Sequence, residues 1–346
     1  YILETSMSNM NSEEMFNINT IFDKVAQHKR ISTNDALVLF QGSSVGELAQ
    51  MADIRRKQLV GDSVSYIRNI HIEPTNICRN KCKFCSYRHN EGDTKAYKLS
   101  KEQILEKIKQ AGEISEVHIV GGLHPDCNLE FYTHLFSTIR ADFPAIHRKG
   151  LTAEEIKYLS DLSGLSYVDI LGKLIDSGLQ SMPGGGAEIF DPRVRKQICP
   201  EKLTGNEWIE IHKTAHKLGI STNATMLYGH VETLIDRINH LADLRELQDE
   251  TQGFNAFIPL KYRLSANSLG LTKETPLLDD LKMFAIARIF LDNFPHLKAY
   301  WPMLGLENAL LMLDFGADDL DGTIAQSTAI YESTGNIGIN GITVED

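Results

Sequence analysis

The sequence predicts an α/β protein that folds as a (β/α)8 TIM-type barrel with an N-terminal helical extension. From residue 66 on, short apolar or β-branched runs alternate with longer segments that have helical spacing. Alternating strand and helix favours a parallel sheet, and eight such units favour a closed barrel. The candidate strands cover residues 67–74, 116–120, 145–149, 179–182, 221–226, 255–260, 297–302 and 319–321. The last run is short and acidic, so an open barrel of six units with an appended tail is the alternative.

Residues 1–65 form the predicted helical extension, and residues 66–346 form the barrel with a C-terminal tail. One helical face gathers four apolar residues of the extension, Ile21, Phe22, Val25 and Ala26. Residues 32–35 offer capping side chains before residues 36–40, and a further helix is predicted over residues 45–59, ending at Gly61. The extension carries no chemical motif, so we expect it to pack on the barrel.

Residues 100–112 illustrate the helices that the pattern predicts between strands. Ser100 can cap this helix, with Gln103 three residues later as in a capping box. Ile104, Ile108 and Ala111 form an apolar stripe, and Gly112 suits a left-handed stop.

Composition narrows the function classes. The chain has 346 residues, and 35 Lys and Arg against 46 Asp and Glu give a formal charge of −11, which disfavours nucleic-acid binding. The sequence contains no run of about 18 consecutive apolar residues, so no membrane span is expected. The N-terminal residues lack the basic-then-apolar pattern of a secretion signal. Three of the five cysteines crowd into eight residues, which makes a poor disulfide framework and suits a reducing cytoplasm.

Unusual sequences follow the candidate strands at residues 75–87, 121–126, 183–190, 223–232 and 261–267. In barrels of this class, functional residues gather at the C-terminal ends of the strands. We therefore expect these five stretches to meet on one face of the barrel.

Cys78, Cys82 and Cys85 follow the first predicted strand with three and two residues between them. Thiolates are soft ligands that suit iron–sulfur clusters or zinc. Three thiolates on one loop would leave one iron of a [4Fe–4S] cluster without a cysteine, open to a small molecule. Zinc with a fourth ligand from His71 or His89 remains the alternative, although zinc knuckles favour pairs with two intervening residues.

The three-cysteine spacing, with Phe84 before the last cysteine, resembles the signature of the radical S-adenosylmethionine (SAM) superfamily. The resemblance implies that SAM chelates the open iron through its amino and carboxylate groups and is split to a 5′-deoxyadenosyl radical. Gly121-Gly122 after the second strand resembles the glycine motif of that superfamily, whose backbone receives the SAM amino group. Glycine permits such a close backbone approach.

Residues 68–76, 121–125, 183–190 and 223–232 resemble the group that contains the menaquinone futalosine-pathway enzymes and the deazaflavin synthases. Residues 257–260, 299–305 and 315–322 are similar to aminofutalosine synthases. Ser86-Tyr87 departs from the Ala-Phe of many relatives. Membership implies addition of the deoxyadenosyl radical to 3-[(1-carboxyvinyl)oxy]benzoate, then rearrangement and decarboxylation to 6-amino-6-deoxyfutalosine, with SAM as co-substrate.

Such a substrate is a dicarboxylate, so this acidic chain must place cations locally. Arginine binds carboxylates through two parallel hydrogen bonds, which favours Arg88, Arg193 and Arg195. The expected catalytic residues are His124 and Arg88. A histidine at this position could move a proton near pH 7. Expected cofactor ligands are Phe84, Tyr87, Gly121, Gly122, Ser181, Glu188 and Arg195. Expected substrate ligands are Arg193, Asn223, Thr225, His230 and Tyr262.

The expected partner is an electron donor such as flavodoxin or ferredoxin, and Cys127 and Cys199 are expected to be unligated thiols. Two alternatives stay open. A dehypoxanthine futalosine cyclase-type enzyme would abstract hydrogen and release deoxyadenosine. A non-catalytic binding protein, stabilised by zinc or a cluster, would not cleave SAM at all.

Overall fold

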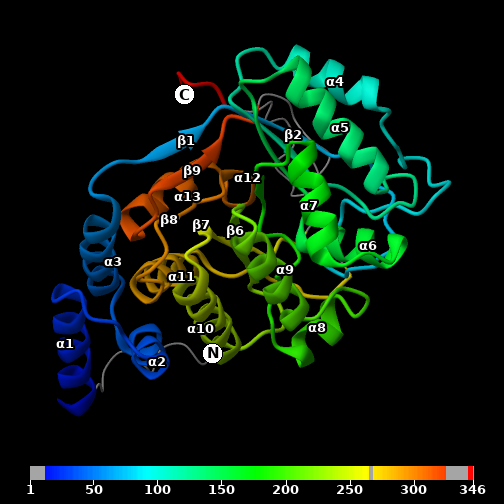
Figure 1. Cartoon of the computed structure of the whole chain (residues 1–346). Helices are drawn as coiled ribbons and strands as arrows, with labels where there is room; N and C mark the ends of the chain where they lie inside the picture. The colour runs from blue at the N-terminus through cyan, green and yellow to red at the C-terminus, as the bar shows by residue number, and fades with distance from the viewer. Residues whose placement is uncertain (1–11, 265–267, 325–341, 346) are drawn as a thin grey trace.

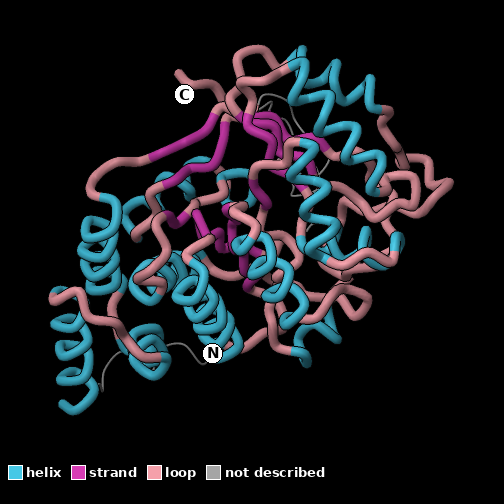
Figure 2. Tube along the Cα trace, viewed as in Figure 1, coloured by secondary structure: helices cyan, strands magenta, loops and turns pink. Residues whose placement is uncertain are grey.

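A curled sheet of seven parallel strands lies at the centre of the protein, with helices outside it (Figures 1 and 2). The computed structural model describes residues 12–264, 268–324 and 342–345. The strands pair in chain order: β2 (Asn69–Ile72), β3 (Glu116–Ile119), β4 (His147–Gly150), β5 (Ser181–Met182), β6 (Ser221–Tyr228), β7 (Phe254–Lys261) and β8 (His296–Leu297). This arrangement confirms the predicted TIM-type α/β fold.

The last predicted strand forms β9 (Asp319–Gly322), which pairs in parallel with the short β1 (Ser65–Ile67). The backbone N–H of Ala299, just after β8, donates to the carbonyl of Asp319 at 2.7 Å. On the other side, the N–H of Thr323 donates to the carbonyl of Ile67 at 2.9 Å. Backbone hydrogen bonds thus connect β9 to the segment just after β8 at one end of the curled sheet and to β1, which leads into β2 at the other end.

Each helix of the barrel follows a strand or extends the connection between two strands. The helices that the structure describes are α1 (Ser12–Ala26), α2 (Thr33–Gly42), α3 (Val45–Val60), α4 (Lys101–Gln110), α5 (Leu129–Asp142), α6 (Ala153–Ser163), α7 (Tyr167–Ser177), α8 (Pro192–Ile198), α9 (Gly205–Lys217), α10 (Leu234–Thr251), α11 (Leu277–Phe290), α12 (Trp301–Leu304), α13 (Leu306–Leu311) and the 3-10 helix η1 (Met312–Phe315). None of them combines the length and apolar character that a membrane-spanning helix needs.

Local sequence explains where these helices begin. Six of them start with a reciprocal capping box, in which a Ser or Thr and an acidic residue or Gln satisfy each other's backbone N–H groups. In α4, Ser100 N–H donates to Gln103 Oε1 at 2.7 Å, as the sequence predicts. A capping box also forms between Thr152 and Glu155 at the start of α6. This first turn of the helix lines the candidate site.

The N-terminal helices pack on the barrel, α3 against α11 and α2 against α10 (Figure 1). Arg30 pairs with Asp249 and with Asp292, 3.0 Å away, and Lys282 Nζ donates to the carbonyl of Phe40 at 3.0 Å. These contacts agree with the prediction that the extension packs against the barrel. Its status as a separate domain, divided at residue 65, stays a prediction.

Two predicted strands differ most from the observed ones. The strand predicted over residues 67–74 splits at Arg68, because Ile67 pairs with β9 whereas Asn69 pairs with β3. The strand predicted over residues 297–302 ends at Leu297, and Trp301 begins α12. Pro302 suits the first helical turn, where its missing N–H costs no hydrogen bond, so the prediction was too long at this end.

Helix α9 contains a half-buried histidine, His216, whose ring is held at both nitrogens. His216 Nδ1 lies 2.7 Å from Thr251 Oγ1, and Nε2 lies 2.8 Å from Thr222 Oγ1. Phe254 packs edge-on against the ring at 4.8 Å between centroids. Burial lowers the pKa of His216 to about 4, so the folded protein holds this ring neutral.

We predict that this histidine makes the fold sensitive to mild acid. Between pH 6.5 and 4 the unfolded chain binds a proton here and the folded chain does not, so the free energy of unfolding falls as the pH falls. The contribution is roughly 2–3 kcal/mol over that window. His216→Gln should reduce the pH dependence measured by urea unfolding, whereas His134→Gln, at an exposed position on α5, should not. Equal pH profiles for wild type and H216Q would contradict the assignment.

Candidate active site at the cysteine loop

The candidate site is a cavity of about 280 Å³ at the C-terminal ends of the strands. Cys78, Cys82 and Cys85 line it together with Gly121 and Gly122, which follow β3. The first turn of α6, the glycine loop after β5 and the ends of β6 and β7 complete its wall. Segments that are far apart in the sequence therefore meet around the three cysteines, as the barrel prediction requires.

Backbone hydrogen bonds hold the cysteine loop from two sides. Gly122 N–H donates to the carbonyl of Thr75 at 2.7 Å, and Arg79 N–H donates to that of Leu123 at 3.2 Å. At the far side, Lys83 N–H donates to the carbonyl of Ile198 at 2.8 Å, at the end of α8. Gly122 is required sterically, since a Cβ there would lie 2.2 Å from the carbonyl oxygen of Ile77.

The donor set fits an iron–sulfur cluster better than a single zinc ion. Three thiols from one loop line one cavity, and Cys82 is buried. His71, a candidate fourth zinc ligand, is engaged inside the barrel, where its Nε2 lies 3.3 Å from His118 Nδ1. The other, His89, lies 3.6 Å from Asp93 through Nδ1.

A largely buried lysine that the sequence did not single out supplies positive charge beside the cysteines. Lys202 Nζ donates to Glu188 Oε1 at 2.7 Å and lies 5.5 Å from the centroid of the Phe84 ring. Burial opposes its charge, but Glu188 and then Cys82 hold the pKa of Lys202 well above its ordinary value. Burial raises the pKa of the Cys82 thiol, and the Lys202 ammonium opposes that shift. The ammonium therefore favours the thiolate, the form of cysteine that binds iron.

Two carboxylates in the first turn of α6 connect the cysteine loop to the glycine pair. Glu155 Oε1 accepts a hydrogen bond from Gly121 N–H at 3.1 Å, and Glu154 Oε1 accepts one from Asn80 Nδ2 at 2.7 Å. Burial raises the pKa of Glu155 to about 7, although hydrogen bonds from Thr152 and Gly121 oppose the shift. The capping-box pattern at residues 152–155 was the available sequence signal, but it indicates only a helix start.

The structure brings some of the predicted site residues together and leaves others apart. The residues that line the cavity are Cys78, Cys82, Cys85, Phe84, Tyr87, Arg88, Gly121, Gly122, Glu188 and Thr225. The residues that do not line it are His124, Ser181, Arg193, Arg195, Asn223, His230 and Tyr262. The binding and catalytic roles assigned to both groups stay predictions.

Neither arginine on α8 presents a free guanidinium to the cavity. Arg195 is buried, and its Nη1 and Nη2 donate to the carbonyls of Ala187 at 2.6 Å and Gly186 at 3.2 Å. It therefore shapes the glycine loop after β5 instead of offering its hydrogen bonds to a carboxylate. The side chain of Arg193 is 51% exposed and pairs with Asp236, away from the cysteines.

The remaining predicted polar residues outside the cavity have local partners. His124 Nδ1 accepts a hydrogen bond from Asp126 N–H at 3.1 Å. His230 Nε2 lies 2.9 Å from the carbonyl of Leu227, and its ring is 6.1 Å from that of Tyr262. Ser181 Oγ lies 2.7 Å from His147 Nε2. Asn223 lies beside Gly184, where a Cβ would meet the Asn223 carbonyl at 2.7 Å.

The barrel interior carries a polar cluster that no motif identified. Its members are His71, His118, Glu116, Lys149, Lys298 and Asp321, with ion pairs of 2.8 Å between Lys149 and Glu116 and between Lys298 and Asp321. Barrel interiors are usually filled with branched apolar side chains. Because side chains on a strand alternate, His118 lies on the same face of β3 as Val120, which lines the cavity. The polar interior thus continues from the cysteine site.

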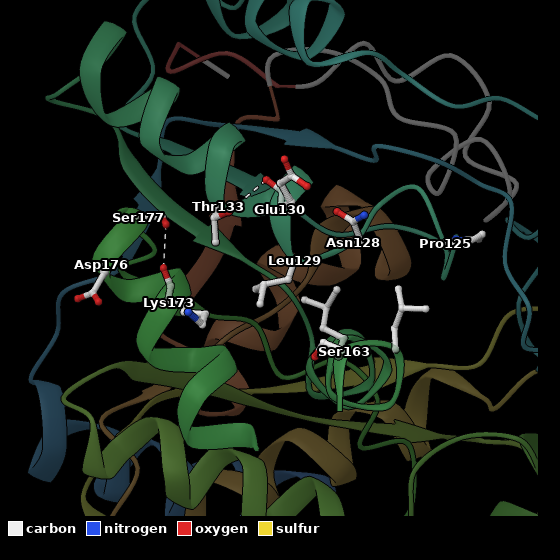
Figure 3. Close-up of a pocket in the computed structure, with 11 residues that line it drawn as sticks. Pro125, Asn128, Leu129, Glu130, Thr133, Ser163, Lys173, Asp176 and Ser177 are labelled. Atoms are coloured by element: carbon white, nitrogen blue, oxygen red, sulfur yellow. Dashed lines mark hydrogen bonds between the residues drawn. The ribbon is translucent and has the colours of Figure 1, made fainter. Parts of the chain in front are cut away.

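A larger hollow of about 760 Å³ lies outside the barrel, between α5, α6 and α7 (Figure 3). Asn128, Glu130 and Lys173 line it, and the hydrogen bonds drawn there, such as Thr133 to the carbonyl of Glu130, are internal to a helix. It contains no cysteine and none of the predicted site residues. The smaller cavity is therefore the candidate active site.

We predict that Gly122→Ala displaces the cysteine loop and impairs cluster assembly. The added methyl group would overlap the Ile77 carbonyl, which is backbone and cannot rotate away. Anaerobically reconstituted G122A should bind clearly less iron per chain, with unchanged helix content by circular dichroism. Gly46→Ala is the matched control, because a Cβ there meets nothing within 4 Å. Iron content of G122A equal to that of G46A would refute the steric argument.

Comparison with known proteins agrees with this site. The model of the radical SAM superfamily matches residues 72–244. Aminodeoxyfutalosine synthase of Thermus thermophilus is 40% identical over 90% of this chain and 85% of its own. A 5-amino-6-(D-ribitylamino)uracil–L-tyrosine 4-hydroxyphenyl transferase of Methanosarcina barkeri is 42% identical over 82% of this chain and 76% of its own.

Solved structures show the same fold at low sequence identity. Methylornithine synthase (PylB) superposes with a TM-score of 0.74 over 93% of this chain and 92% of its own, at 16% identity. HydG, a maturase of the [FeFe]-hydrogenase, superposes with a TM-score of 0.73 over 96% of this chain and 72% of its own, at 16% identity. The family match, the relatives and the three-cysteine cavity agree: this chain is an enzyme of the radical SAM superfamily, in the group that includes the aminodeoxyfutalosine synthases.

Proposed function

We propose that this enzyme is an aminofutalosine synthase of menaquinone biosynthesis. It would add the 5′-deoxyadenosyl radical to the enol ether of 3-[(1-carboxyvinyl)oxy]benzoate, and rearrangement with loss of a carboxylate would give 6-amino-6-deoxyfutalosine. The observation that carries the proposal is the cavity in which three cysteines face the glycine pair. Similarity to the Thermus thermophilus synthase over 90% of the chain supports the choice of family member.

The cysteine loop would hold a [4Fe–4S] cluster, which supplies the one-electron chemistry that splits SAM. The chain's own residues form the compartment around it. Gly121 and Gly122 leave room for close approach to the backbone, while Glu154 and Glu155 hold the cysteine loop and the glycine pair in place through Asn80 and Gly121. The surrounding barrel excludes water, which protects a reactive radical from side reactions.

Arg88 is the residue best placed to bind a substrate carboxylate. It lines the cavity, and its Nε is buried without a hydrogen-bond partner in the part of the chain that the structure describes. The other cation of the cavity, Lys202, is already paired with Glu188. A guanidinium with an unused donor binds a carboxylate strongly, so Arg88 would orient the enol ether towards the cofactor.

Two other reactions of this group compete with the proposal. A dehypoxanthine futalosine cyclase-type enzyme would release 5′-deoxyadenosine instead of transferring the adenosyl group. A tyrosine 4-hydroxyphenyl transferase is suggested by the Methanosarcina barkeri relative, which is 42% identical over 82% of this chain, against 40% over 90% for the Thermus thermophilus synthase. The non-catalytic binding protein, by contrast, is set aside by membership of the enzyme superfamily.

Product mass distinguishes the three reactions. Anaerobically reconstituted enzyme is reduced with dithionite and incubated with SAM and 3-[(1-carboxyvinyl)oxy]benzoate, and in parallel with SAM, L-tyrosine and 5-amino-6-(D-ribitylamino)uracil. The proposal predicts an adenosyl–substrate adduct that lacks one carboxylate in the first mixture and no coupled product in the second. Deoxyadenosine alone in the first mixture, or a coupled product in the second, would refute it.

We predict that Cys82→Ser abolishes SAM cleavage, whereas Cys127→Ser retains it. Loss of one of three thiolates removes a ligand of the cluster, and removal of even an outer-shell partner of a metal ligand costs 10- to 100-fold, so we expect a decrease of roughly 100-fold or more. Cys127 is a matched control, because it is a buried free thiol that does not line the cavity. Methionine release under dithionite measures the effect, and equal rates for both variants would contradict the ligand assignment.

A further inference from the structure

The segment that surrounds the cysteines is basic in an otherwise acidic protein. Residues 77–101 contain seven Lys or Arg and two Asp or Glu, whereas the whole chain has a formal charge of −11. Charge of one sign gathered on one part of a surface creates a local potential that steers partners of the opposite sign. This charge distribution is not explained by binding of the small substrate alone, because most of these side chains point to solvent.

Three of the basic residues lie at the surface of the cysteine loop itself. Arg79, Lys81 and Lys83 are exposed. Arg79 lies 3.4 Å from Asp161 in an exposed ion pair, which contributes little fixed structure. Lys81 and Lys83 form no ion pair within the described part of the chain. Their charges are therefore available to a partner.

These charges lie directly above the candidate cluster site. Lys81 and Lys83 are the sequence neighbours of Cys82, which is buried and lines the cavity. Two solvent-exposed lysines thus flank a cysteine that lines the cavity. The loop is held in place there, since Lys83 N–H donates to Ile198 and the Lys83 carbonyl accepts from Ser268 N–H at 2.8 Å. The surface is preformed, which lowers the entropic cost of docking.

We propose that Arg79, Lys81 and Lys83 form the docking surface for an acidic protein that donates single electrons, such as a reduced flavodoxin. The inference rests on the proposed function in one respect, because it requires that the enzyme cleaves SAM with one electron from a donor. One electron would pass from the reduced donor through the cysteine loop to the cluster, and the donor would leave oxidised by one electron. Redox partners form small, transient interfaces, for which a few exposed lysines around the electron entry point are sufficient.

Charge reversal tests this surface against a matched control. Lys81→Glu/Lys83→Glu changes the formal charge by −4, and so does Lys109→Glu/Lys217→Glu. Lys109 and Lys217 are exposed in or beside the last turns of α4 and α9, away from the cysteine loop. Binding of an acidic flavodoxin to each reconstituted protein is measured by titration calorimetry at two salt concentrations. We expect K81E/K83E to weaken binding on the order of tenfold at low salt and to remove most of its salt dependence, with the control close to wild type.

Activity with two reductants separates the docking surface from the chemistry. With reduced flavodoxin, methionine release by K81E/K83E should fall on the order of tenfold, whereas with dithionite it should equal wild type. Equal losses in the two variants, or unchanged flavodoxin binding by K81E/K83E, would overturn the proposal. Tighter binding of an RNA oligonucleotide than of flavodoxin would also overturn it, in favour of a nucleic-acid surface. Wild-type enzyme that fails to cleave SAM with dithionite would refute the proposed function instead.

Discussion

The close approach between the cysteine loop and the glycine pair after β3 is the constraint on which the rest of the site depends. Gly122 N–H bonds to Thr75, and the space that a Cβ would need at Gly122 is occupied by the Ile77 carbonyl. This contact fixes the backbone that presents Cys78, while Glu155 binds the N–H of Gly121 from the third side. The cysteines, the glycines and α6 are therefore one unit, and displacement of any one of them would move the other two.

Positively charged side chains lie on both the inner and the outer side of this unit. Lys202 lies beside the cysteines and is paired with Glu188, whereas Arg88 lines the same cavity with a donor still unused. Exposed Arg79, Lys81 and Lys83 lie on the outer side of the loop. An acidic chain can thus place positive charge at the two points that the proposed chemistry requires, the carboxylate of the substrate and the entry point of the electron.

Much of the fold was predictable because strand and helix periodicities differ and helix starts carry capping patterns. Each of the eight predicted strands has an observed counterpart, and the cap at Ser100 is present as expected. The ends of the strands were less predictable. The break between β1 and β2 falls at Arg68, because Ile67 before it pairs with β9 and Asn69 after it pairs with β3. In the site, the dense motifs placed the cysteines and glycines in one cavity. Lys202 and Glu154 were not predicted as site residues, because their contacts form between segments that are distant in the sequence. Arg195 resembled a ligand in the sequence, but its hydrogen bonds go to backbone carbonyls.

The central claim is that three cysteines hold a cluster with one iron left open for SAM. Mössbauer spectroscopy of protein reconstituted anaerobically with iron-57, recorded before and after addition of SAM, tests it most directly. The account predicts a [4Fe–4S] spectrum in which one of four iron sites changes its isomer shift when SAM binds. A spectrum in which SAM changes none of the iron sites, or protein that retains zinc in place of iron, would contradict it.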